Sequence, residues 1–174
     1  MRKIILQLAV SLDSFIEGPN GEFDWCFTDQ DYGMSAFLDR VDTIFTGRKT
    51  YELLLGLGEH GKAAFPPLKY YVFSRTLSGV EKGDCLVKGD IEKEIFNIKN
   101  SPGKDIWLFG GANLTSSLMQ LGLVDEIALA VHPVLLGEGK PLFTALPGRI
   151  NLQFTGSKVY STGLVFLTYR VLYN

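Results

Sequence analysis

Residues 46–52, TGRKTYE, combine glycine, basic and hydroxyl side chains where an apolar stretch gives way to a helical pattern. Gly47 ends the apolar stretch, and Arg48, Lys49 and Thr50 open the helix. The N-terminus of a helix carries free N–H groups and a positive dipole end, so it attracts anions and disfavours cations. A bound anion would offset the cost of two cations at this place. A solvated basic turn explains this stretch equally well.

A second stretch, FSRTL at residues 73–77, places Ser74 and Arg75 directly after an apolar run. The guanidinium group of arginine is a planar fork of donors that suits phosphate oxygens. Taken alone, this stretch is explained by an exposed arginine in a loop.

The third stretch is DIWLFGGANL at residues 105–114, in which two glycines separate an apolar run from a helical pattern. Gly110 and Gly111 allow a ligand to approach the backbone closely, and the helix start would point N–H groups at it. A tight turn explains the glycines alone. The three stretches together favour a ligand with several phosphates.

The elements that must position these residues follow from the apolar periodicity. We predict strands at 3–10, 42–47, 66–74, 84–89, 106–109 and 123–137, and helices at 29–41, 48–55, 90–100 and 112–121. Residues 11–31 and 137–143 are predicted to be a loop and a turn, and residues 151–173 a hairpin. This order predicts an α/β fold in one domain, residues 1–174. It would have three layers: a mostly parallel central sheet, helices on both faces, and an antiparallel C-terminal hairpin.

In open sheets of this kind, ligands bind at the carboxyl ends of the strands. The three stretches all follow strands, so we expect them to meet at one edge. The dinucleotide motif G-x-G-x-x-G and the P-loop are both absent from the sequence. A dinucleotide would therefore be held by a different arrangement of loops.

Composition narrows the classes of partner. The net charge is −2 and the pI is about 5.7, so the chain as a whole has no electrostatic attraction to nucleic acid or to an anionic membrane. No apolar run approaches the length of about 18 residues that a membrane span needs. With two cysteines and two histidines at unrelated spacings, we expect no metal site. We expect a cytoplasmic protein that binds a small-molecule substrate.

The order of LAVSLD, GRKTYE, FSRT, WLFGGANL and VDEIALAVHPVLLGEGKPLF closely resembles the dihydrofolate-reductase-like superfamily. It is most similar to stand-alone relatives of the reductase domain of bacterial riboflavin biosynthesis, the RibD C-terminal domain. The resemblance implies NADPH as the cofactor. It assigns the adenosine 2′-phosphate to Arg48, Ser74 and Arg75, and the nicotinamide to Ala9 and Ile16. It assigns the pyrophosphate to Gly110, Gly111, Ala112, Asn113 and Leu114, with Gly47, Lys49 and Thr50 nearby.

The resemblance also implies a reductase of a pterin or of a ribosylaminopyrimidine-like compound. Asp31, sixteen residues before Gly47, matches the acidic residue that binds and helps to protonate the pterin in dihydrofolate reductases. A carboxylate that only favours the helix dipole is the competing interpretation, and Asp13 and Asp29 are alternative candidates. Ser14 replaces the glycine of the SLDG sequence that is usual in the riboflavin-type reductases.

The roles of several ring-bearing side chains, the catalytic activity and the oligomeric state are further points on which the sequence gives expectations. Phe23, Trp25 and Phe27 could stack on a substrate or could pin the first loop to the core, and His132 is most simply a hydrogen-bonded core histidine. The protein could also be a non-catalytic NADPH-binding or redox-sensing module. We expect a homodimer, because the small reductases of this group are often dimers and the apolar stretch 127–137 suits an interface.

Overall fold

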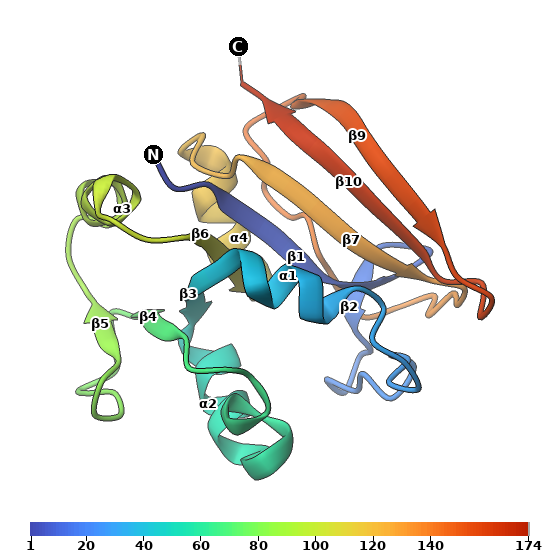
Figure 1. Cartoon of the computed structure of the whole chain (residues 1–174), viewed down its shortest axis with the longest axis horizontal. Helices are drawn as coiled ribbons and strands as arrows, with labels where there is room; N and C mark the ends of the chain where they lie inside the picture. Colours follow the sequence, from blue (N-terminus) through green and yellow to red (C-terminus); the bar gives the residue numbers. More distant parts are fainter. Residues whose placement is uncertain (174) are drawn as a thin grey trace.

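Strands and helices alternate along the first two-thirds of the chain, and strands alone follow (Figure 1). The computed structural model describes residues 1–173. The strands are β1 (Ile4–Ser11), β2 (Phe15–Glu17), β3 (Val41–Gly47), β4 (Lys69–Phe73), β5 (Cys85–Val87), β6 (Asp105–Gly110), β7 (Glu126–His132), β8 (Lys140–Pro141), β9 (Asn151–Val159) and β10 (Val165–Leu172). The helices are α1 (Met34–Arg40), α2 (Arg48–Gly56), α3 (Ile91–Asn100) and α4 (Ala112–Gln120), with 3₁₀ turns η1 (Gly58–His60) and η2 (Lys62–Ala64).

Eight strands form one sheet in the order β5-β4-β3-β6-β1-β7-β10-β9. The pairs from β5 to β7 are parallel, and β10 is antiparallel to both β7 and β9. The predicted fold class, a mostly parallel sheet with an antiparallel C-terminal pair, is confirmed. β4, β3 and β6 are neighbours, so the carboxyl ends of the strands before the three phosphate-suited stretches lie side by side.

Helix α1 is shorter than the predicted helix at 29–41. It begins only at Met34, because Tyr32 and Gly33 have φ angles of 49° and 84°. Both angles lie in the left-handed region, which a right-handed helix cannot contain. Asp29 and Asp31 therefore precede α1, and its first turn holds no acidic residue.

A small second sheet joins two segments that the sequence assigned to a loop and a turn. β2 pairs with β8 in an antiparallel sense, with Phe15 opposite Pro141 and Glu17 opposite Lys140. These two short strands are more than a hundred residues apart in the chain. Their pairing brings the loop that follows β1 to the loop that follows β7.

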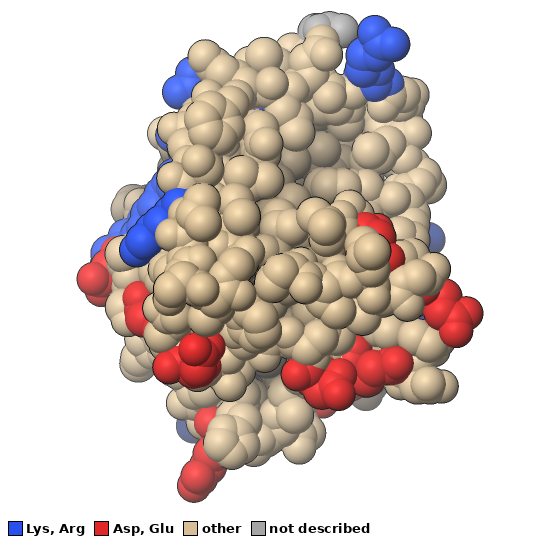
Figure 2. Space-filling view, turned by 90° about the vertical axis from the view of Figure 1, so that its right-hand side faces the viewer, with Lys and Arg blue, Asp and Glu red and all other residues tan. Residues whose placement is uncertain are grey.

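Strand β9 is the exposed edge of the main sheet. Figure 2 looks onto this side of the molecule, and most of the visible surface is uncharged. Phe154 and Val159 are 57% and 72% exposed, and Leu152 is exposed as well. By contrast, β7 pairs with β1 on one side and β10 on the other. Both edges of β7 are therefore occupied, so a second chain could not extend the sheet at this strand, and the use of residues 127–137 as an interface stays a prediction.

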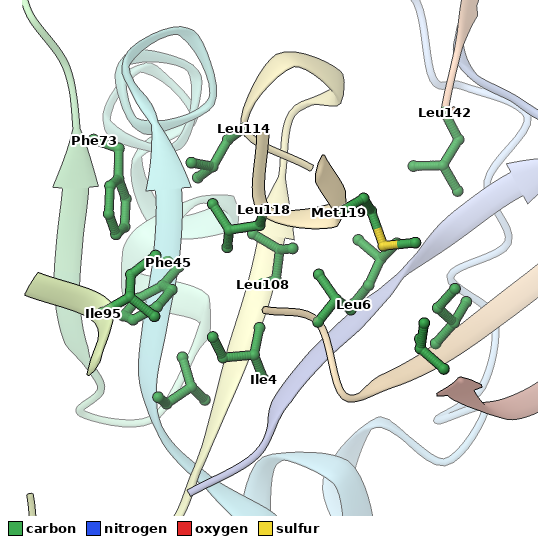
Figure 3. Packing of buried hydrophobic residues seen from close by; sticks show 14 of the residues in the cluster. Ile4, Leu6, Phe45, Phe73, Ile95, Leu108, Leu114, Leu118, Met119 and Leu142 are labelled. Carbon is green, nitrogen blue, oxygen red and sulfur yellow. The ribbon is translucent and has the colours of Figure 1, made fainter. Parts of the chain in front are cut away.

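The first core cluster lies between the sheet and helices α3 and α4. It includes Ile4 and Leu6 of β1, Ile95 of α3, and Leu114 and Leu118 of α4 (Figure 3). Helix α3 is stabilised by its N-cap, since the side chain of Asp90 accepts a hydrogen bond from the backbone N–H of Lys93 at 3.1 Å.

The second cluster covers the opposite face of the sheet. Ile5 of β1, Trp107 of β6, and Tyr51 and Leu54 of α2 are buried there, and Phe37 of α1 packs against them. β1 therefore alternates between two apolar layers, which explains why its sequence is apolar on both faces. The helices cover both faces of the sheet, as predicted.

The first loop is held to the sheet by His132, which is only 3% exposed. Its Nε2 accepts a hydrogen bond from the backbone N–H of Phe27 at 3.1 Å, and its Nδ1 lies 3.0 Å from the carbonyl oxygen of Ala130. The rings of Trp25 and Phe27 pack edge-on against the imidazole, with centroids 5.3 and 5.0 Å away. These contacts favour a pinning role for Trp25 and Phe27, and they make His132 a hydrogen-bonded core histidine.

In residues 1–173, no helix has both the length and the apolar character that crossing a bilayer requires. Across the same residues, no group of three or more histidine, cysteine and acidic side chains is arranged to hold a metal ion.

The environment of His132 predicts a pH dependence of stability. Burial lowers the pKa of His132, so the unfolded chain takes up a proton more readily than the folded protein does. The free energy of unfolding should therefore fall as the pH drops below about 6.5, the ordinary value for histidine. In His132→Gln this fall, measured by urea unfolding between pH 7.5 and 5.5, should be smaller. The same change at His60, which lies exposed on η1, is the control. An undiminished fall in His132→Gln would contradict the assignment.

Candidate functional site

A cavity of about 550 Å³ lies at the carboxyl ends of β3, β4 and β6. The three stretches singled out from the sequence meet in it. Its lining includes ten of the thirteen predicted cofactor-binding residues: Gly47, Arg48, Lys49, Thr50, Ser74, Arg75, Gly111, Ala112, Asn113 and Leu114.

The cavity is strongly basic. Arg48, Lys49, Arg75, Lys88 and Lys140 line it, and no acidic residue does. Five cations in one cavity are notable in a chain whose net charge is −2. Charge of one sign in a cleft raises the local concentration of oppositely charged ligands. The cavity is therefore suited to a ligand with several negative charges.

Two helices begin at this cavity without a side-chain cap. Helix α2 follows Gly47 and helix α4 follows Gly111, and neither N-cap residue makes a side-chain hydrogen bond. The first N–H groups of an α-helix have no partner within the helix. Two sets of unpaired donors and two positive dipole ends thus border one cavity, an arrangement that favours phosphate.

The diglycine turn shapes the wall between these helix starts. Gly110 has a φ of +98°, a conformation that favours glycine. A Cβ at Gly111 would lie 3.3 Å from Oγ1 of Thr50 and 3.9 Å from Nζ of Lys140. A side chain at Gly111 would therefore crowd Thr50 on the cavity wall, next to the start of α4.

Ser74 builds the turn that presents Arg75. Its Oγ accepts hydrogen bonds from the backbone N–H groups of Thr76 and Leu77, at 3.2 and 3.1 Å. The hydroxyl hydrogen of Ser74 can still be donated to a ligand.

Three predicted cofactor-binding residues lie outside the lining of the cavity. Gly110 directly precedes Gly111, which lines the cavity. Ala9 is in the carboxyl half of β1, the strand next to β6, and Ile16 is in β2 and packs against the first core cluster.

Lys140 and Lys88 are residues of the cavity that the sequence reasoning missed. Lys140 belongs to β8, and its Nζ lies 2.9 Å from a carboxylate oxygen of Glu17 in β2. Nothing local in GEGKPLF, residues 137–143, indicates this position, because it depends on the pairing of two distant strands. Lys88 directly follows β5, so the search for basic residues after strands could have found it.

Asp31 lines neither this cavity nor the second one described below. Its carboxylate accepts hydrogen bonds from the backbone N–H groups of Gly33 and Ser35, at 3.0 and 2.8 Å, and from the hydroxyl of Ser35 at 2.7 Å. The hydroxyl of Ser35 contributes most to a pKa of Asp31 below the ordinary value. Asp31 is therefore ionised at neutral pH and organises the start of α1.

The alternative carboxylates are also held locally. Asp13 accepts hydrogen bonds from the hydroxyl of Ser11 at 2.6 Å and from the backbone N–H of Gly137 at 2.8 Å, and the first of these contributes most to its lowered pKa. Asp13 thereby ties the loop after β1 to the loop after β7. Asp29 accepts a hydrogen bond from the hydroxyl of Tyr32 at 2.7 Å.

Ser14, the departure from the SLDG pattern, has a φ of +68°. The chain thus keeps a left-handed backbone conformation at this place without a glycine. The backbone carbonyl of Ser14 accepts a hydrogen bond from the N–H of Leu142 at 3.0 Å.

A second cavity of about 500 Å³ lies between α1 and the sheet. Ile5, Phe37, Ala128 and Phe166 contribute apolar walls to it. Its polar lining includes Tyr32, Arg40, Glu126, Lys158, Tyr160 and Arg170.

The chain is similar to known proteins both in sequence and in fold. The RibD C-terminal domain family matches residues 2–166. The chain is 44% identical to Uncharacterized protein YyaP of Bacillus subtilis (strain 168) over 181 residues, which cover 97% of this chain and 95% of that protein. A putative riboflavin biosynthesis protein from Shewanella sp. PV-4 has a TM-score of 0.86 at 27% identity, over 99% of this chain and 100% of that one. The dihydrofolate reductase from Enterococcus faecalis, solved with NADP(H), has a TM-score of 0.69 at 17% identity, over 97% and 96% of the two chains.

The absence of a side chain at Gly111 yields a prediction for ligand binding. In Gly111→Val the added side chain should occupy the space between Thr50 and Lys140, so NADPH affinity should fall by at least about tenfold, a loss on the order of 1.4 kcal/mol. The melting temperature should fall only modestly, because Thr50 on the cavity wall has to shift to admit the side chain. Gly79→Val is the matched control, since a Cβ at Gly79 meets no atom within 4 Å. Normal NADPH titration of Gly111→Val would show that the glycines serve only the turn.

Proposed function

The chain belongs to the RibD C-terminal domain family, and we propose that it is an NADPH-dependent reductase of a small heteroaromatic compound. Its fold is that of the dihydrofolate-reductase-like proteins. The observation that carries the proposal is the basic cavity between two uncapped helix starts, because its donors and charges suit a dinucleotide with an additional phosphate.

The residues present fit the phosphates of NADPH. Arg48, Ser74 and Arg75 would hold the 2′-phosphate, since two guanidinium groups and a hydroxyl provide charge-assisted donors. Lys88 and Thr76 line the same cavity and would add to this set.

The pyrophosphate would lie against the start of α4. The backbone N–H groups of Ala112, Asn113 and Leu114 would bind its oxygens, and Gly111 leaves room for the approach. Lys49, Thr50 and Lys140 would surround it from the side of α2 and β8, and Lys140 would then exchange its contact with Glu17 for a phosphate oxygen.

Bound NADPH would supply a hydride to the substrate. Ala9 and Ile16 would form the apolar wall beside the nicotinamide, on the side where the loop after β1 crosses the sheet. Asp13 would keep this loop in place through its hydrogen bonds to Ser11 and Gly137. The protein's main task would be to hold the reacting atoms in register.

We propose a pterin or a ribosylaminopyrimidine-like compound as the substrate. Asp31 would bind its ring N–H or amino groups. The lowered pKa favours this orienting role over the role of a proton donor, because an ionised carboxylate only accepts hydrogen bonds. The proton that reduction requires would then come from water.

A homodimer in the cytoplasm completes the proposal. The exposed apolar residues of β9, Phe154 and Val159 foremost, support an interface at this edge of the sheet. Unpaired edge strands readily pair with another chain.

The cofactor assignment predicts a preference for NADPH over NADH in the native protein. Replacement of Arg48 and Arg75 by alanine should abolish most of it, because each charge-assisted contact contributes about 1.5–3 kcal/mol, or roughly tenfold or more in affinity. Arg149→Ala, which removes an exposed cation outside the cavity, should leave the preference intact. Equal affinity of the native protein for both nucleotides, measured by titration, would refute the assignment.

The role of Asp31 is tested by turnover of a substrate found by screening dihydrofolate, the ribosylaminopyrimidine and a panel of pterins. Asp31→Asn should lower turnover by roughly 10- to 100-fold, because it weakens a charge-assisted hydrogen bond to the substrate, which contributes about 1.5–3 kcal/mol. Ser35→Ala removes a hydrogen bond to the same carboxylate and keeps its charge, so it controls for the structural role. Equal, small effects of both changes would leave Asp31 as a residue of the helix start. NADPH binding without turnover across the whole panel would favour the non-catalytic binding module.

A further inference from the structure

Gln7, in the middle of β1, is a buried polar residue without a complete set of partners. It is 5% exposed, and its side-chain oxygen Oε1 accepts no hydrogen bond within residues 1–173. Burial of an amide oxygen without a partner costs free energy, so most buried side-chain polar atoms in proteins are paired. An unpaired carboxamide in the central strand therefore requires an explanation.

The side chains next to Gln7 are small towards β7 and aromatic towards β6. Gln7 pairs with Ala128 of β7, and Ala9, two residues further along the same face, pairs with Ala130. Ala9 and Ala130 are half-buried, so solvent reaches the sheet beside them. The three alanines of this row present only methyl groups on this face of the sheet.

Aromatic side chains stand next to this row on β6. Trp107 is fully buried, and its Nε1 donates a hydrogen bond to the backbone carbonyl of Gln7 at 2.8 Å. Phe109 packs against Trp107 with ring centroids 4.7 Å apart. A flat ring lying over the alanines would be bordered by these aromatic groups and would meet the carboxamide of Gln7 with one of its edges.

Gln7 also lies between two places already described. Ile5, on the same face of β1, lines the second cavity together with Ala128. Ala9, also on this face but two residues beyond Gln7, is the predicted contact of the nicotinamide. A substrate that receives a hydride beside Ala9 would therefore lie within reach of Gln7.

We propose that Gln7 determines substrate specificity by binding the lactam edge of the heteroaromatic ring. This inference rests on the proposed reductase function and deepens it. A carboxamide offers an acceptor oxygen next to a donor N–H group, and a lactam offers an N–H next to a carbonyl. The two edges are complementary, so Oε1 accepts from the ring N–H while Nε2 donates to the ring carbonyl.

The same arrangement explains how the site rejects other flat compounds. A ring without the lactam edge leaves the carboxamide unpaired in a site that has lost its water, and such a loss strongly disfavours binding. The unpaired Oε1 is the cost that the free protein bears for this selectivity.

The test uses the whole protein saturated with NADP⁺, and pterin as the probe, followed by calorimetric titration. 2-Aminopteridine, which keeps the bicyclic ring and the amino group of pterin but has no lactam, should bind at least about tenfold more weakly than pterin. Gln7→Met has a similar volume without hydrogen-bonding groups, and it should weaken pterin binding by at least about tenfold while leaving NADP⁺ affinity unchanged. It should also raise the melting temperature, since it removes an unpaired buried polar group.

Tyr70→Phe is the matched control. The hydroxyl of Tyr70 is likewise buried without a hydrogen-bond partner within residues 1–173. Tyr70 belongs to the second core cluster, which also contains Trp107, and lies on β4, further along the sheet. This change should leave pterin affinity unaltered. Unchanged pterin affinity in Gln7→Met would overturn the proposal, as would a native protein that binds NADP⁺ but not pterin. A native protein that does not bind NADP⁺ at all would instead refute the proposed function.

Discussion

The site depends on two helices that start side by side with their first N–H groups unpaired. Helices α2 and α4 follow β3 and β6, which are neighbours in the sheet, and both start at a glycine without a side-chain cap. Two positive dipole ends and several cations at one place repel one another. The fold tolerates this because it stabilises these helices elsewhere, through Tyr51 and Leu54 on one face and Leu114 and Leu118 on the other. An anionic ligand would remove the remaining electrostatic cost.

The parallel sheet makes this arrangement possible. Parallel strands with crossover helices put all their carboxyl ends at one edge, so stretches far apart in the sequence converge there. Helix α3, by contrast, has a side-chain N-cap in Asp90. The small β2–β8 sheet adds Lys140 to the same place and ties the loop after β1 to it. The fold thus places a basic cavity at the carboxyl ends of β3, β4 and β6.

Local patterns predicted most of the fold and the phosphate-suited part of the site. The strand predicted at 3–10 is β1. The glycines at 47 and 111 stand where the apolar run of a strand gives way to the apolar spacing of a helix, and helices α2 and α4 begin there. The errors concern features decided by distant contacts. Tyr32, Ala36 and Phe37 lie at helical spacing, which predicted a helix from residue 29. Tyr32 and Gly33 adopt left-handed conformations instead, so α1 begins at Met34. Lys140 was missed because only pairing of β8 with a strand more than a hundred residues away brings it to the cavity. The unpaired oxygen of Gln7 was likewise invisible, since a single glutamine in an apolar strand says nothing about its neighbours on other strands.

A crystal structure of the protein with NADPH tests the central claim most directly. The account predicts that the pyrophosphate oxygens lie within hydrogen-bonding distance of the backbone N–H groups of residues 112–114 at the start of α4. It also predicts that the 2′-phosphate contacts Arg48 and Arg75. A nucleotide whose phosphates lie in the second cavity, or anywhere away from the two helix starts, would contradict the account.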